Sequence, residues 1–162
     1  MNKLVIEGNI GAGKSTLCEY FERRGAHGKI ITLPEKIQPD FLKLFYGDTK
    51  KYGFAFQLHM LEHRTHANAL KFVQIQHSYE SSYQPLPLVL LDRSIVGDYV
   101  FAMVNYLTQS ITPEEFGVYQ SLASCNDSSK LGFLLDTTYG TKEWHFLYLH
   151  SSFDDCKRRI DE

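Results

Sequence analysis

Cysteine is scarce in this sequence, and no hydrophobic run is long. The three cysteines, Cys18, Cys125 and Cys156, are far apart and show no C-x-x-C spacing. This argues against a disulfide framework or a zinc knuckle and favours a reducing compartment. No apolar stretch approaches the roughly 20 residues of a membrane helix, and the first residues are typical of neither a signal peptide nor a transit peptide. We therefore expect a cytoplasmic protein with no membrane partner.

An excess of positive charge is also lacking. Seventeen Lys and Arg stand against 19 Asp and Glu among 162 residues, a formal net charge of −2. Proteins dedicated to nucleic-acid polymers normally carry a basic excess, so we expect no such partner. An acidic small molecule remains possible, because a few well-placed cations suffice to bind one. The hydrophobic share of 43% and the charged share of 22% are typical of one globular domain.

Short apolar segments alternate with helical patterns along the chain. The predicted strands are residues 4–6, 30–33, 88–91 and 146–149. Because buried strands that alternate with helices are typical of a parallel sheet, the fold class is α/β. We expect a P-loop NTPase-type parallel sheet flanked by helices, in a single domain covering residues 1–162.

The helices between these strands carry recognisable start and stop signals. Gly25 is in the position that ends the first helix, and a long helix is predicted from about Tyr52 to Tyr79. Residues 112–115 read Thr-Pro-Glu-Glu, which is a capping box at the start of a later helix. A serine at 151 or 152 caps the last helix, and residues 126–130 form a polar loop.

The segment from Gly8 to Ser15 matches G-x-x-x-x-G-K-[ST] and lies between a predicted strand and a predicted helix, as that phosphate-binding motif requires. Its glycines let backbone N–H groups turn inward around a phosphate. Lys14 can reach the β- and γ-phosphates of ATP, and the Ser15 hydroxyl can ligate Mg²⁺. The expected nucleotide-binding residues are Gly8, Asn9, Ile10, Gly11, Ala12, Gly13, Lys14, Ser15 and Thr16.

Two acidic residues come just after predicted strands. Glu35 follows the second strand and Asp92 the third, at the edge where parallel α/β sheets bind ligands. An aspartate there can hold Mg²⁺ or accept a proton, and Arg93 beside it can clamp a phosphoryl group. We therefore expect Glu35, Asp92 and Arg93 to be catalytic, together with Lys14. Ser15 and Asp92 are the expected metal ligands.

Five short motifs in this order resemble the deoxynucleoside kinases. They are GNIGAGKST at 8–16, LPE at 33–35, LFYGD at 44–48, FAFQ at 54–57 and DRS at 92–94. Residues 146–160 are similar to that family's fourth strand and following helix. The chain ends two residues after Ile160, about where that family's arginine-rich lid begins. We therefore expect the lid and the last strand to be missing from this sequence.

The resemblance implies roles for individual residues. Glu35 would contact the 5′-hydroxyl of a deoxynucleoside, Tyr46 its 3′-hydroxyl, and Gln57 its base. Asp92 and Arg93 would occupy the catalytic pair, and either Glu35 or Asp92 could take the proton. The implied reaction is ATP-dependent phosphorylation of a deoxynucleoside to its monophosphate, in nucleotide salvage, and the implied assembly is a homodimer.

Arg64 and Asp98 resemble the pattern of family members that prefer deoxycytidine or purine deoxynucleosides. An aspartate held by an arginine can accept a hydrogen bond from an exocyclic amine, which thymine lacks. An ordinary surface ion pair is the alternative interpretation.

Three other functions remain open. A thymidylate-type nucleoside-monophosphate kinase shares the phosphate loop and a DR pair, but its usual arginine motif is absent from residues 32–35. A degenerate, non-catalytic family member is another alternative. Residues His59 to His63 spell H-x-x-E-H, an inverted zinc-protease motif with His66 one turn further on, but no third ligand can be identified.

Overall fold

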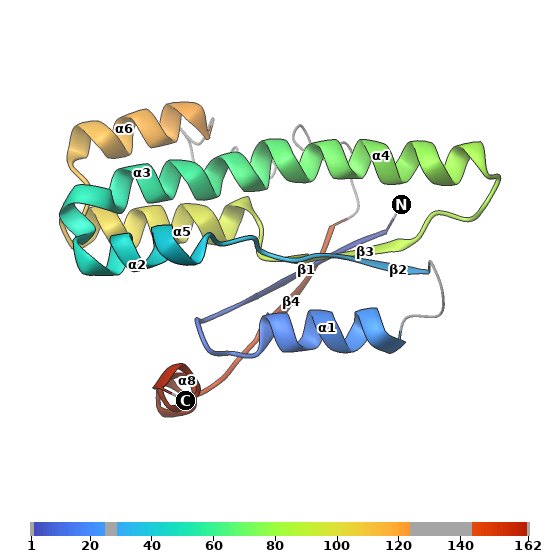
Figure 1. Cartoon of the computed structure of the whole chain (residues 1–162), viewed down its shortest axis with the longest axis horizontal. Coiled ribbons are helices and arrows are strands. Elements are labelled where there is room, and N and C mark those ends of the chain that lie inside the picture. Colours follow the sequence, from blue (N-terminus) through green and yellow to red (C-terminus); the bar gives the residue numbers. More distant parts are fainter. Residues whose placement is uncertain (1, 25–28, 124–143, 162) are drawn as a thin grey trace. The chain divides into compact units, whose positions relative to one another are not determined.

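A computed structural model describes residues 2–24, 29–123 and 144–161 (Figure 1). Gly25, Cys125 and the segment 126–130 lie outside these ranges. The chain divides into two compact units. Unit 1 contains Met1–Glu35, Val73–Ser94 and Lys142–Glu162, and unit 2 contains Lys36–Phe72 and Ile95–Thr141. Whether the chain is one domain, as its length and composition predict, stays a prediction.

Unit 1 is built on a parallel sheet. Its strands are β1 (Lys3–Gly8), β2 (Ile30–Leu33), β3 (Leu88–Asp92) and β4 (Trp144–Leu149), in the spatial order β2-β3-β1-β4. All three neighbouring pairs are parallel. The two central strands, β1 and β3, bury Val5, Ile6, Val89, Leu90 and Leu91 completely, as expected for the centre of a sheet covered on both faces. The predicted α/β class and the predicted strands are confirmed.

Helices flank this sheet. Helix α1 (Lys14–Arg24) packs against β1, β2 and β3, and in Figure 1 the strands lie between α1 and α4 (Asn68–Ser81). Helix α8 (Phe153–Asp161) follows β4. The register pairs Ile6 with Asp92 and Gly8 with Leu149, so the ends of β1, β3 and β4 lie at one edge, where α/β proteins place their ligands.

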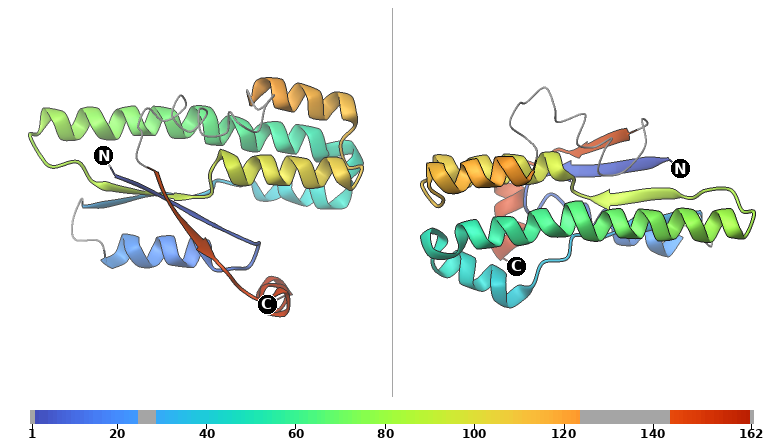
Figure 2. Two further views of the ribbon diagram at one scale, coloured as in Figure 1. Left: turned by 180° about the vertical axis from the view of Figure 1, so that it is seen from behind. Right: turned by 90° about the horizontal axis from the view of Figure 1, so that it is seen from above.

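Unit 2 gathers helices around an aromatic core. Its helices are α2 (Pro39–Gly47), α3 (Thr49–Glu62), the π-helix η1 (His63–Ala67), α5 (Ile95–Leu107) and α6 (Pro113–Leu122). The first turn of α4 continues directly from η1 in the sequence, and Figure 2 shows α2, α3, α5 and α6 as neighbouring helices of this unit. Phe56 is buried, and its ring stacks on Phe45 at 4.8 Å and meets Phe41 edge-on at 5.4 Å. Such pairs add to the free energy gained by burying the rings.

Local hydrogen bonds explain where several helices begin. The predicted capping box at α6 is confirmed, because Oγ1 of Thr112 accepts from the Glu115 N–H and Glu115 accepts from the Thr112 N–H. Oδ1 of Asp48 accepts from the Lys51 N–H at the start of α3. Ser152 caps α8 by accepting from the Asp155 N–H. Each such cap stabilises its helix by about 1 kcal/mol.

The predicted helix from about 52 to 79 differs from the structure in one respect. The helical residues run from Thr49 to Ser81, but a π turn over His63–Ala67 interrupts the α-helical spacing. A π turn inserts an extra residue and therefore rotates the side chains around it. His63 and Arg64 are buried on this turn, where an α-helical pattern alone does not specify their direction.

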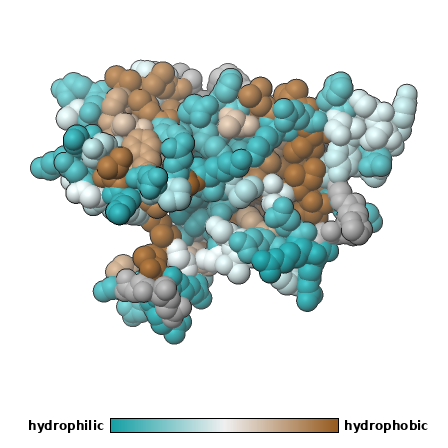
Figure 3. All heavy atoms as spheres, viewed as in Figure 1, coloured by the Kyte–Doolittle hydropathy of each residue, from teal (hydrophilic) through white to brown (hydrophobic). Residues whose placement is uncertain are grey.

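Hydrophilic residues cover most of the face shown in Figure 3, with smaller exposed areas of hydrophobic residues between them. Within the described ranges, none of the helices combines the length and the apolar character needed to cross a bilayer.

Candidate functional site

The phosphate-binding loop of unit 1 connects β1 to α1. Gly8 and Gly11 have φ angles of 152° and 76°, which residues with a Cβ rarely adopt. A Cβ on Gly8 would lie 2.6 Å from the carbonyl oxygen of Leu149, and one on Gly11 would lie 2.6 Å from that of Cys156. The glycines are therefore required by the close approach of β4 and α8 as well as by the turn itself.

Lys14 lies inside this loop. Its side chain is 7% exposed, and Nζ donates to the carbonyl oxygens of Gly8 (3.1 Å) and Asn9 (2.8 Å). Burial, and next the positive charge of Arg93, lowers the pKa of Lys14 from its usual 10.5. An ammonium group held among loop carbonyls is placed to meet an anion bound by the loop.

The hydroxyl of Ser15 joins the start of α1 to the end of β3. Ser15 Oγ donates a 2.7 Å hydrogen bond to Oδ2 of Asp92. The other carboxylate oxygen, Oδ1, is buried and has no hydrogen-bond partner among the described residues. Because a hydroxyl and a carboxylate oxygen are ligands that Mg²⁺ accepts, this pair fits the predicted metal site. Burial, and next the charge of Asp92, raises the pKa of the nearby Cys18 thiol to about 12, which disfavours the reactive thiolate.

Arg93 occupies an unusual backbone position immediately after Asp92. Its φ is 68°, a region that costs a residue with a Cβ roughly 1–3 kcal/mol. Its side chain forms an ion pair with Glu35, with Nε 3.5 Å from Oε2. The structure thus brings together Glu35, Arg93 and the loop residues predicted for phosphoryl transfer, all within unit 1.

Glu7 and Ser94 were not predicted, and they hold this turn. The Arg93 N–H donates to the Ile6 carbonyl at 3.0 Å. Both the N–H and the hydroxyl of Ser94 donate to Oε1 of Glu7, at 2.8 and 2.7 Å. Strand β1 therefore holds the peptide groups on both sides of Arg93. The carbonyl of Ile6 accepts from the one before it, and the side chain of Glu7 accepts from the one after it. An acidic residue inside an otherwise apolar buried strand is the signal that sequence reasoning could have used.

A second set of polar side chains is buried in unit 2. Gln57, Arg64 and Asp98 are 2%, 4% and 1% exposed. Arg64 Nη1 donates to Asp98 Oδ1, and Gln57 Nε2 donates to the Asp98 carbonyl at 3.2 Å. Burial contradicts the interpretation of Arg64 and Asp98 as a surface ion pair, because both charges are removed from solvent.

Two further residues belong to this buried set, and neither was predicted. Tyr119 donates a 2.7 Å hydrogen bond to Oδ2 of Asp98, and Asn105 Nδ2 donates to Oε1 of Gln57 at 3.2 Å. We refer to Gln57, Arg64, Asp98, Asn105 and Tyr119 as the buried polar cluster. No spacing rule connects these residues, which come from α3, η1, α5 and α6.

Tyr46 is a predicted substrate-binding residue of unit 2 that lies outside the buried polar cluster. It lies on α2, is 61% exposed, and its ring contacts Phe45. Its predicted contact with a sugar hydroxyl stays a prediction.

The H-x-x-E-H motif places His59 on α3 and His63 on η1. In the part of the chain that the structure describes, no group of three or more His, Cys, Asp or Glu side chains is arranged to hold a metal ion. A zinc site at this motif therefore lacks a third ligand among those residues.

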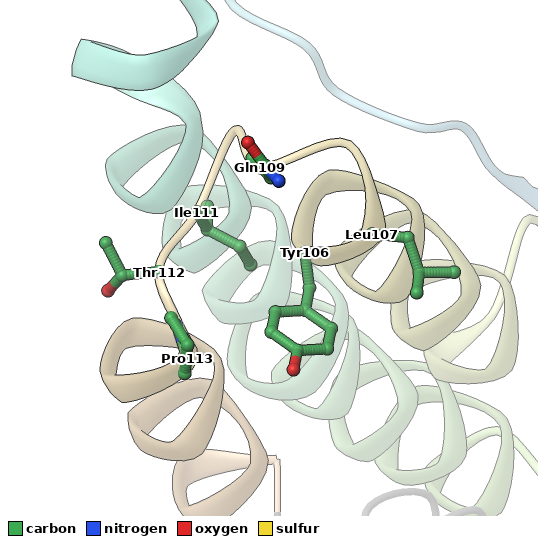
Figure 4. A pocket seen from close by; sticks show the side chains of 6 residues that line it. All are labelled: Tyr106, Leu107, Gln109, Ile111, Thr112 and Pro113. Carbon is green, nitrogen blue, oxygen red and sulfur yellow. The ribbon is translucent and has the colours of Figure 1, made fainter.

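A surface pocket of about 470 Å³ lies elsewhere in unit 2, between the end of α5 and the start of α6 (Figure 4). Its lining residues are Tyr106, Leu107, Gln109, Ile111, Thr112 and Pro113. None of the predicted site residues lines it, and its lining lacks charged groups, so it is not the phosphoryl-transfer site.

A family model and the curated relatives described here both match this chain to deoxynucleoside kinases. A family model described as "Deoxynucleoside kinase" matches residues 4–162. A deoxyadenosine kinase from Lactobacillus acidophilus is 28% identical over 97% of this chain and 64% of its own length. A deoxyguanosine kinase from Dictyostelium discoideum is 34% identical over 74% of this chain and 39% of its own length. The chain thus spans less than two thirds of these relatives.

The fold is shared with a solved structure. A deoxyadenosine kinase from M. mycoides superposes with a TM-score of 0.64 and 24% identity, over 98% of this chain and 69% of that chain. This similarity shows the parallel sheet and flanking helices of a P-loop fold.

Proposed function

This chain belongs to the deoxynucleoside kinase family, and on that premise we propose that the protein transfers the γ-phosphoryl group of ATP to the 5′-hydroxyl of a deoxynucleoside. The observation that carries the proposal is the cluster in unit 1, where Lys14 and Ser15 of the phosphate loop lie close to Asp92 and to the Arg93–Glu35 ion pair. These are the groups that phosphoryl transfer needs for positioning and charge neutralisation.

The proposed reaction assigns the proton to Glu35. The 5′-oxygen bonds to the γ-phosphorus while the bond from that phosphorus to the β–γ bridging oxygen breaks, and Glu35 accepts the hydroxyl proton. The products are ADP and a deoxynucleoside 5′-monophosphate. Asp92 is less suited to this role, because Ser15 donates to one of its oxygens and the other is proposed to hold the metal. Arg93 holds Glu35 and neutralises the phosphoryl group.

ATP and Mg²⁺ are the proposed cofactors. The loop N–H groups and Lys14 would hold the phosphates, and Ser15 and Asp92 would hold the metal, for which the unpartnered Oδ1 of Asp92 is the supporting observation. A bound Mg²⁺ would neutralise charge on the phosphates and fix their position. We also propose a cytoplasmic location, supported by the free, buried thiols of Cys18 and Cys156.

The buried polar cluster is the proposed base-reading site. Asp98 would accept a hydrogen bond from an exocyclic amine, Arg64 would keep the carboxylate charged, and Gln57 would pair with the base through its amide. The relatives described above are named for adenine and guanine nucleosides, whose bases carry such an amine. Thymine would instead present a carbonyl oxygen to the carboxylate and so place two acceptors against each other.

A homodimer is the proposed assembly. Val100, Met103, Val104 and Leu107 recur at helical spacing on α5 and are 37–69% exposed. An exposed apolar stripe of this kind favours association with another surface. Light scattering should give twice the chain mass for the wild type, and Val104→Glu should reduce it to the monomer value.

The proposed activity is tested by offering the full natural protein ATP, Mg²⁺ and either deoxynucleosides or deoxynucleoside monophosphates. We expect monophosphates to form from deoxynucleosides, with deoxyadenosine or deoxycytidine favoured over thymidine by roughly ten- to a hundredfold in kcat/KM. Glu35→Gln should abolish turnover while ATP still binds. Acceptance of monophosphates alone would favour the thymidylate-kinase type instead, and absence of any turnover would favour a non-catalytic member.

A further inference from the structure

The phenol of Tyr119 reaches from α6 to the carboxylate of Asp98 on α5. Tyr119 is fully buried, and Oη donates a 2.7 Å hydrogen bond to Oδ2. The other carboxylate oxygen, Oδ1, accepts from Nη1 of Arg64. Each oxygen of Asp98 therefore has a donor of its own, and the two donors come from different helices.

Neighbouring contacts fix both ends of this hydrogen bond. The Tyr119 ring is nearly parallel to that of Phe116 at 6.2 Å and lies 6.4 Å from that of Tyr99. The backbone of Asp98 is held by the Gln57 amide at 3.2 Å. The aspartate carboxylate thus has little freedom to rotate about its own side-chain bonds.

The hydrogen-bond inventory of these groups has a consequence for ligand choice. An ionised carboxylate oxygen can accept two hydrogen bonds, so Oδ2 keeps acceptor capacity after Tyr119 has donated to it. Arg64 can only donate, and the hydrogen bond that Tyr119 donates to Oδ2 is stronger to an ionised carboxylate than to a protonated one. The two donors together therefore favour an Asp98 that accepts hydrogen bonds and cannot donate one.

We propose that Tyr119 is a specificity-determining positioning residue, which keeps Asp98 an obligate acceptor and so restricts the base to one that presents an exocyclic amine. The proposal rests on the proposed function. Without the hydroxyl, Oδ2 loses a donor, and the carboxylate can rotate or take up a proton. A protonated Asp98 donates to a carbonyl oxygen, so a thymine-type base is then tolerated.

The direct test compares Tyr119→Phe with the wild type. We expect the ratio of kcat/KM for deoxycytidine or deoxyadenosine over that for thymidine to fall about tenfold. The change should lie in the KM of the nucleosides, because Tyr119 touches no reacting atom, and the KM of ATP should stay the same.

Tyr99→Phe is the matched control. It removes a hydroxyl from the ring that packs beside Tyr119. That hydroxyl accepts a 3.4 Å hydrogen bond from Gln120 and not from a group that holds Asp98. Its selectivity ratio should stay within about twofold of the wild type. An unchanged ratio in Tyr119→Phe, or an equal loss in Tyr99→Phe, would overturn the proposal.

A second comparison covers the case in which Tyr119→Phe does not fold because it leaves a buried charge short of a donor. Asp98→Ala removes both that charge and the oxygen to which Tyr119 donates, so Asp98→Ala alone and Asp98→Ala with Tyr119→Phe should show the same selectivity if Tyr119 acts only through Asp98. A further change of the ratio in the double variant would contradict the proposal.

Calorimetric binding of deoxycytidine and thymidine separates the two hypotheses. If the wild type binds deoxycytidine selectively but phosphorylates nothing, the proposed kinase activity fails, and the same variants test Tyr119 by binding alone. If the wild type is an active kinase whose selectivity Tyr119→Phe leaves unchanged, only the role of Tyr119 fails. A wild type that binds no nucleoside would overturn both.

Discussion

Ser15 and Asp92 are 77 residues apart in the sequence, and the hydroxyl of Ser15 donates a 2.7 Å hydrogen bond to Oδ2 of Asp92. The bond connects the first turn of α1 to the last residue of β3. Both strands that precede these residues end at the same edge of the sheet, because β1 and β3 are parallel and pair Ile6 with Asp92. The groups proposed to hold the metal are therefore assembled by the sheet.

Lys14→Ala should remove nucleotide binding and turnover while the protein stays folded. The substitution deletes the cation inside the phosphate loop, and its hydrogen bonds to Gly8 and Asn9. We expect kcat/KM for ATP to fall at least about a hundredfold, measured by steady-state kinetics alongside circular dichroism. Lys29→Ala, at an exposed lysine of the same unit, should behave as the wild type. Unchanged ATP affinity in Lys14→Ala would disprove the assignment of this loop.

Asp92→Asn should raise the Mg²⁺ concentration needed for half-maximal activity and lower kcat. The amide keeps the size of the side chain but removes the charge that would attract the metal, including that on the buried Oδ1. We expect a loss of about a hundredfold in kcat at a fixed Mg²⁺ concentration. A titration of activity against Mg²⁺ measures both effects, with Asp154→Asn on the surface of α8 as control. An unaltered Mg²⁺ requirement would remove Asp92 from the metal site.

Glu7→Gln should lower kcat about tenfold with little change in the KM of ATP. Oε1 of Glu7 accepts two hydrogen bonds from Ser94, and a neutral amide oxygen accepts them more weakly than a carboxylate, so the turn that holds Arg93 at a φ of 68° is weakened. Glu7→Ala should be more severe and should also reduce the free energy of unfolding by about 1–3 kcal/mol. If Glu7→Ala lowers stability but leaves kcat intact, Glu7 does not position Arg93.

Acidification below pH 6.5 should destabilise the protein through His63. Burial, and next the charge of Arg64, lowers the pKa of His63 from its usual 6.5. The other charged neighbours are Lys71, Glu62 and Lys36. Because the unfolded chain takes up this proton at a higher pH than the folded chain, the free energy of unfolding falls as the pH drops below 6.5. Above that pH both states are neutral, and the effect vanishes.

Urea unfolding of the wild type and of His63→Gln at about pH 7.5 and about pH 5.5 measures this effect. The loss of stability between the two conditions should be smaller in His63→Gln. His66→Gln, at an exposed histidine of the same π turn, should lose as much stability as the wild type. Equal losses in all three proteins would show that His63 does not titrate in this range.

Local chemistry alone determined much of this protein. The strands were predictable because short apolar runs that alternate with helical patterns are typical of a parallel sheet. The cap of α6 was predictable because Thr112 and Glu115 stand three residues apart. The phosphate loop was predictable because phosphate binding requires small residues, a lysine and a hydroxyl in consecutive order. Arg64 and Asp98 were found as separate positions, through resemblance to a family.

Tertiary structure alone decided which side chains meet. The hydrogen bonds from Ser94 to Glu7 and from Tyr119 to Asp98 join residues 87 and 21 positions apart, and no periodicity encodes such a distance. The π turn at His63–Ala67 points Arg64 in a different direction from the one a continuous α-helix would give it, and helix propensity does not predict such a turn. The sequence left open whether Arg64 and Asp98 form a surface ion pair. In the folded protein both are buried, so each charge needs a partner in place of the water that would otherwise solvate it.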